Sequence, residues 1–89
     1  MPDSSDFSYL EGGAEQEAAD IVRDVVAWYS TQIAAERGAP VPDDERIEEL
    51  TAGRQAALAD QAQLATADLE EAERIVTVYA AWLKELREP

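Results

Sequence analysis

The clearest hydrophobic pattern in the chain lies at residues 68–87. Its apolar residues recur every three or four positions, which is the spacing of an amphipathic helix. One row consists of Leu69, Ala72, Val76, Tyr79, Leu83 and Leu86, and a second row beside it consists of Ile75, Val78 and Trp82. Because the two rows make a face wider than a two-stranded coiled-coil seam, we expect at least two neighbouring helices to cover it.

A second helical pattern covers residues 14–37. Gly38 then stands where a C-terminal glycine cap is expected, and Pro40 cannot continue a helix. The pattern therefore predicts a helix that ends at residue 37. Its expected core positions are Ala18, Ile21, Val22, Val25, Trp28, Tyr29 and Ile33.

The third helical pattern, at residues 42–65, is weaker than the one at 68–87. Arg54 and Gln61 stand where a heptad count from Ile47 would place core residues. Gly53 lies near the middle, where glycine costs about 1 kcal/mol relative to alanine. We expect a helix here with an incomplete apolar seam.

The connections between the three expected helices are short. Short connections favour antiparallel neighbours, so the helices are predicted to run up, down and up. Asp68 lies three residues before Glu71, which is the spacing of a capping box, and we expect it to cap the last helix. The sequence thus predicts an all-α fold, a small up-down-up three-helix bundle at residues 14–89.

Counting along the helices predicts how they are registered. Trp28 and Trp82 each lie about 14 residues after the start of a helix, or about 20 Å along its axis. Ala52 and Gly53 fall at the same level of the middle helix, where small residues would admit the two indole rings. We expect an aromatic layer of Trp28, Tyr29, Tyr79 and Trp82. Arg54 would border this layer, extending to solvent or stacking on a tryptophan.

Residues 1–13 interrupt the helical periodicity and are predicted to form a flexible acidic arm. They include proline, serine and a pair of glycines, and their three acidic residues have no basic neighbour. The apolar residues Phe7, Tyr9 and Leu10 would either dock on the bundle itself or form a short linear motif for a partner. These three are candidate partner-binding residues.

Few kinds of catalytic or metal chemistry are open to this chain, because it contains no cysteine and no histidine. Thiolate ligands, disulfides and the commonest general base and metal ligand are therefore missing. Ser30 and Thr31 have no histidine to activate them. The acidic run at residues 43–49 lacks the alternating ligands and central glycine of a calcium loop. We predict a protein that is not an enzyme and that has no cofactor and no metal site.

The net charge of −13 bears most directly on partners. It opposes binding to nucleic acid and to anionic membranes and attracts basic proteins. Asp20, Asp24, Glu48 and Glu49 are the candidate acidic contacts. One interpretation is a small acidic interaction module that binds or inhibits a basic partner, as immunity proteins, antitoxins and polyanion mimics do. The same acidity would also serve solubility alone.

A second interpretation is a structural or adaptor module. The wide apolar face at 68–87 and the incomplete seam at 42–65 would leave apolar surface uncovered. That surface would form a homodimer or join a larger complex. No apolar run approaches the roughly 20 residues of a membrane span. The first residues are acidic, where a signal peptide is basic, so we expect a cytoplasmic protein.

Overall fold

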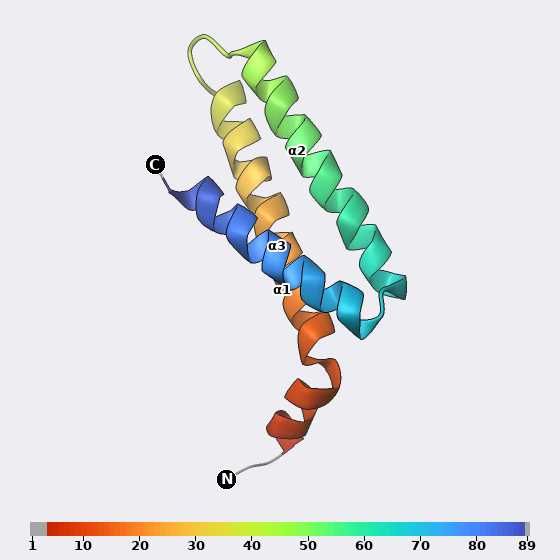
Figure 1. The fold of residues 1–89 in the computed structure, drawn as a ribbon. Coiled ribbons are helices and arrows are strands. Elements are labelled where there is room, and N and C mark those ends of the chain that lie inside the picture. The colour runs from red at the N-terminus through yellow and green to blue at the C-terminus, as the bar shows by residue number, and fades with distance from the viewer. Residues whose placement is uncertain (1–3, 89) are drawn as a thin grey trace.

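The computed structural model describes the backbone of residues 4–88 and the side chains of residues 13–88. Its elements are α1 (Ser4–Arg37), α2 (Asp44–Gln63), a short 3₁₀ helix η1 (Leu64–Thr66) and α3 (Leu69–Arg87). α2 returns beside α1 in the opposite direction, and α3 then crosses α1 obliquely (Figure 1). The predicted all-α three-helix bundle is confirmed.

α1 is the central helix of the bundle. It packs against both α2 and α3, whereas α2 and α3 have almost no backbone contact with each other. The inward face of α1 supplies five buried residues, namely Ala18, Val22, Val25, Tyr29 and Ile33. α3 therefore packs mainly against α1, and α2 reaches it through side chains, as in the hydrogen bond from Tyr79 to Asp60.

The apolar face of α3 is buried along its middle and exposed along its edges. Ala72, Ile75, Tyr79 and Leu83 are buried, and Val76, Trp82 and Leu86 pack beside them partly covered. Leu69 and Val78, which the pattern placed in the buried rows, keep 62% and 52% of their surface exposed. Leu69 lies at the edge of α3 beside α1 and Val78 at the edge beside the end of α2, and two of the nine predicted core positions of α3 thus lie mainly in solvent.

α1 begins at Ser4, well before the predicted start near residue 14. It continues through Gly12 and Gly13, which were expected to break it. A glycine inside a helix costs only about 1 kcal/mol, and no steric clash prevents it from adopting helical angles. The first turns of α1 extend beyond the part of the bundle that α3 crosses (Figure 1).

Aspartate side chains cap both later helices. Asp43 accepts hydrogen bonds from the backbone N–H groups of Glu45 and Arg46, at 3.1 and 3.2 Å, so α2 begins slightly later than predicted. Asp68 accepts from the N–H of Glu71 at 2.8 Å, which confirms the predicted cap of α3. Each such cap typically stabilises a helix by about 1 kcal/mol.

The C-terminal glycine cap predicted for α1 is not formed. No glycine among the described residues has a positive φ angle, which that cap requires. Gly38 N–H instead donates to the carbonyl oxygen of Ala34 at 3.1 Å, and this bond continues the helical pattern by one residue. The predicted end of α1 at Arg37 is nevertheless correct.

The predicted aromatic layer is present. The ring centroids of Trp28 and Tyr29 lie 5.1 Å apart, those of Tyr29 and Trp82 lie 5.8 Å apart, and those of Tyr79 and Trp82 lie 5.0 Å apart. Tilted and edge-to-face pairs at such distances each contribute about 0.5–1.5 kcal/mol beyond their buried area. The layer therefore joins α1 to α3 at mid-height.

Gly53 lies against this layer, but its neighbour differs from the prediction. A Cβ atom added to Gly53 would come within 2.5 Å of Cζ of Tyr29. The residue is small because the phenol ring of Tyr29 passes directly over it. Counting residues along the helices predicted the correct height of Gly53 in the bundle, but predicted the indole rings as its neighbours. Height alone does not determine which side of α1 faces α2.

Candidate functional site

An open groove runs between the part of α1 near residue 14 and the first half of α3. Its volume is about 370 Å³. Small residues of α1 leave this space open, since Gly13 and Ala14 face α3 there. Its lining residues are Gly13, Ala14, Glu17, Leu69, Glu73, Val76 and Thr77. At this end of the bundle α3 crosses α1 at an angle, and α1 extends past the crossing (Figure 1).

The floor of the groove is apolar. Val76 is partly buried against the core, and Leu69 is more than half exposed. The hydroxyl group of Thr77 donates to the backbone carbonyl of Glu73 at 3.2 Å, so its polar atom is bonded to its own helix. Apolar side chains in a concave surface are a common feature of binding sites.

Two carboxylates flank this floor, Glu17 from α1 and Glu73 from α3, and both are exposed. Neither makes an ion pair with any residue in the described part of the chain. The ion pairs found there are Asp20–Arg23, Arg46–Glu49 and Glu71–Arg74. No lysine or arginine lines the groove. The groove therefore combines apolar surface with uncompensated negative charge.

A second, smaller cavity of about 190 Å³ lies between the end of α2 and α3. Here the hydroxyl group of Tyr79 donates to Oδ2 of Asp60 at 2.5 Å. Burial, and then this hydrogen bond and the charge of Asp60, raise the pKa of the Tyr79 hydroxyl above its ordinary value. The phenol thus stays protonated near neutral pH. It links α2 to α3 and is unsuited to act as a base or nucleophile.

Arg54 forms a further polar link between helices. Its side chain is partly buried, and Nη1 donates to Oγ of Ser30 on α1 at 3.4 Å. The sequence predicted the place of Arg54 beside the aromatic layer but not this partner. Its Nε atom is buried without a hydrogen-bond partner among the described residues. The hydroxyl group of Ser30 thus makes a structural contact with the guanidinium group of Arg54.

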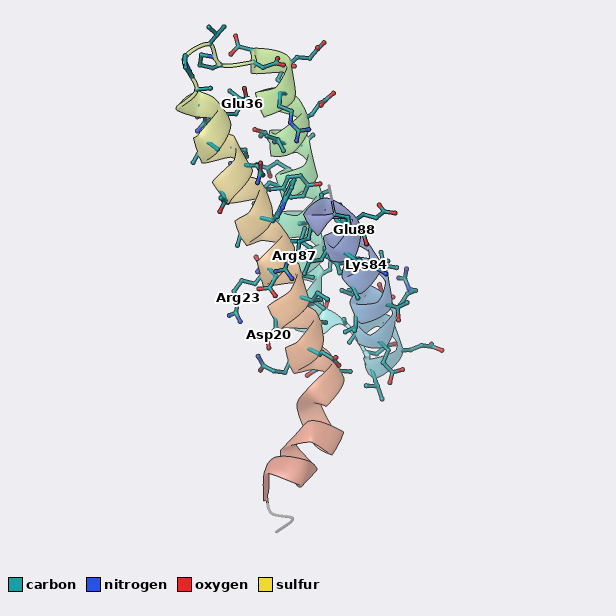
Figure 2. All side chains as sticks on the ribbon, turned by 90° about the vertical axis from the view of Figure 1, so that its left-hand side faces the viewer. Asp20, Arg23, Glu36, Lys84, Arg87 and Glu88 are labelled. Carbon is teal, nitrogen blue, oxygen red and sulfur yellow. The ribbon has the colours of Figure 1, made fainter. Side chains whose placement is uncertain are left out.

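The predicted acidic contacts are not brought together. Asp20 accepts hydrogen bonds from Gln16 at 3.1 Å and from Arg23 at 2.7 Å, and Figure 2 shows Asp20 and Arg23 projecting from the side of α1 away from α3. Asp24 is exposed on the same helix. Glu48 and Glu49 are exposed near the start of α2, at the other end of the bundle. The four predicted acidic contacts therefore do not form one site.

Three other predicted partner-binding residues, Phe7, Tyr9 and Leu10, have side chains outside the described residues. Glu17 and Glu73, which flank the groove, were not predicted to be site residues. Glu73 is one of several acidic residues near the start of α3, and the sequence alone does not separate it from them. Only the contact between α1 and α3, which spans distant parts of the sequence, distinguishes these two acids from the rest.

No group of three or more acidic side chains in the described part of the chain is placed to hold a metal ion. Across the same residues, no helix is long and apolar enough to span a membrane. Comparison with known proteins found no family model, no curated protein and no solved structure that matches this chain.

Proposed function

We propose that this protein is a small acidic helical module that binds a basic partner protein and is not an enzyme. The observation that supports this most directly is the groove between α1 and α3. Its apolar floor is flanked by Glu17 and Glu73, which have no basic neighbours in the described residues. A partner that offers apolar and basic side chains together would complement both features.

The overall charge favours the same class of partner. At a net charge of −13, the field of the protein attracts basic proteins over several ångströms and speeds their encounter. This attraction is screened over about 8 Å at physiological ionic strength. A protein bound to the basic surface of its partner would prevent anionic ligands from binding to that surface. Binding alone would therefore inhibit the partner.

A capture experiment at two salt concentrations tests this function. The immobilised protein is incubated with lysate of its source cell at about 0.05 M and about 0.5 M salt, between which the screening length falls severalfold. We expect the captured proteins to be basic and to be released at the higher salt. The matched control replaces five exposed acids by amides, at Glu17, Asp24, Glu48, Glu49 and Glu73, and should capture less. Capture of acidic proteins, or capture that salt does not alter, would contradict the proposal.

A second candidate function is a structural module that assembles with itself. It is favoured by the exposed apolar residues Leu69 and Val78 of α3. These two residues, however, line different cavities on opposite edges of α3, so they do not form one continuous patch. Two copies would also repel each other electrostatically. Sedimentation at low and high salt separates the candidates, because a chain that stays monomeric in both conditions is not a self-assembling module.

A further inference from the structure

We infer that the groove between α1 and α3 binds one face of a basic amphipathic helix of the partner protein. An apolar side chain of that helix would lie against Leu69 and Val76, and lysine or arginine side chains would lie beside Glu17 and Glu73. This inference rests on the proposed function and adds to it the site and the chemistry of the partner.

The groove is long enough to contact about two turns of one face of a helix. On α3 its lining runs from Leu69 to Thr77, which is about 12 Å of helix axis at 1.5 Å per residue. This length corresponds to about two turns of a bound helix. An amphipathic helix recognised in a groove presents apolar anchors one turn apart. One such anchor can contact the exposed side chain of Leu69, and a basic residue one turn away then lies close to Glu73.

The carboxylates of the groove are available for such a partner. Glu71, two residues before Glu73, already pairs with Arg74 on the opposite edge of α3. Glu73 and Glu17 have no ion pair among the described residues, so a basic partner would not displace an existing contact. Exposed ion pairs each contribute little, and two pairs around an apolar contact supply specificity as well as attraction.

Charge favours a basic helix over two other possible occupants of the groove, which are the N-terminal residues of the same chain and a second copy of the protein. Residues 1–12 contain three acidic residues and no basic residue, so placing them in the groove would bring carboxylates towards carboxylates. A second copy of the protein carries the same net charge of −13 and meets the same repulsion. A basic amphipathic helix satisfies both the apolar floor and the two acids.

The probe for this inference is a fluorescein-labelled helical peptide of lysine and leucine, about 18 residues or five turns long, with all leucines on one face. The control peptide has the same composition with the leucines distributed around the helix. Fluorescence anisotropy measures both affinities. We expect the amphipathic peptide to bind at least about tenfold more tightly, because only it presents apolar and basic side chains together. Equal affinities would contradict the inference.

Two double variants then test the location. Glu17→Gln with Glu73→Gln removes the acids of the groove, and Asp44→Asn with Glu45→Gln removes the same charge from exposed positions on α2. The first should weaken binding of the amphipathic peptide about fivefold to tenfold, as expected for two ion pairs. The second should weaken it less than about twofold, because only long-range attraction changes. Equal weakening would contradict the groove as the site and leave the charge-based function standing.

Single substitutions test the apolar contact. Leu69→Ser removes the exposed leucine of the groove, and Val41→Ser removes a valine that is 83% exposed in the loop between α1 and α2. We expect Leu69→Ser to weaken peptide binding about fivefold and Val41→Ser to leave it unchanged, with the helical circular dichroism of both preserved. If neither peptide binds the wild type while basic proteins are still captured from lysate, the inference about the groove fails and the proposed function stands. If that capture fails as well, the proposed function fails.

Discussion

The side of the bundle that α2 covers differs from the side that it leaves open. On the covered side, the contacts of α2 include Asp60–Tyr79, Arg54–Ser30 and Gly53–Tyr29. On the open side, the groove between α1 and α3 holds Glu17 and Glu73 without ion pairs in the described residues. Side chains on the covered side link the helices, whereas the two acids on the open side make no ion pair among the described residues.

The connection of the helices explains this difference. The short 3₁₀ helix η1 connects α2 to α3, and side chains from the end of α2 reach one edge of α3. Asp60 is thereby carried to Tyr79. Among the described residues, the opposite edge of α3 meets α1, which presents Gly13 and Ala14 there. These small residues leave the groove open.

The largest expected effect follows the loss of the Tyr79 side chain. Tyr79→Ala removes a buried ring that contacts Trp82 and the hydroxyl group that binds Asp60. It should lower the free energy of unfolding by about 3–5 kcal/mol, measured by urea denaturation. Val78→Ala, at an exposed neighbouring position, is the control and should cost less than about 1 kcal/mol. Similar losses for both variants would mean that α3 is held by a different face.

A smaller effect is expected from Gly53→Ala. The new methyl group would collide with the buried ring of Tyr29, and the resulting overpacking costs about 1–3 kcal/mol. The gain in helix propensity, about 1 kcal/mol, offsets part of this loss. Urea denaturation should therefore show a net loss of about 1 kcal/mol.

Gly38→Ala is the matched control for the substitution at Gly53. An added Cβ atom there meets nothing closer than 3.5 Å, and the φ angle of Gly38 is not positive. This control should not destabilise the protein. A stabilised Gly53→Ala variant would show that the ring of Tyr29 moves aside easily and that the contact between α1 and α2 is loose.

Sequence reasoning predicted the contacts that repeat along one helix and missed those that depend on how helices cross. The order of the helices, the cap at Asp68 and the aromatic layer follow from spacing and counting. The start of α1 was misplaced because the glycine pair was treated as a break, although it costs only about 1 kcal/mol for each residue. The groove and the bond from Tyr79 to Asp60 depend on the crossing angle of α3, which side-chain packing between distant segments sets.

Tyr79→Phe isolates the hydroxyl group of the covered side. The ring stays in place while Asp60 loses its hydrogen-bond donor, so we expect a loss of about 1 kcal/mol in urea denaturation. The effect should depend on pH. Because the folded state raises the pKa of Tyr79, this group stabilises the protein below about pH 10, its ordinary pKa, and the stabilisation declines as the pH rises further. Wild-type stability should therefore fall more steeply above about pH 10 than that of Tyr79→Phe, and parallel pH profiles would contradict the link.

The smallest effect is expected on the open side. The double variant Glu17→Gln with Glu73→Gln breaks no ion pair within the described residues and reduces the self-repulsion of a strongly acidic chain. Its melting temperature, followed by circular dichroism, should equal or slightly exceed that of the wild type. Glu71→Gln is the control, since it removes the partner of Arg74 and should lower the melting temperature slightly. A drop in the double variant as large as that in the control would mean that the groove acids stabilise the fold, and they would then be poor candidates for a binding site.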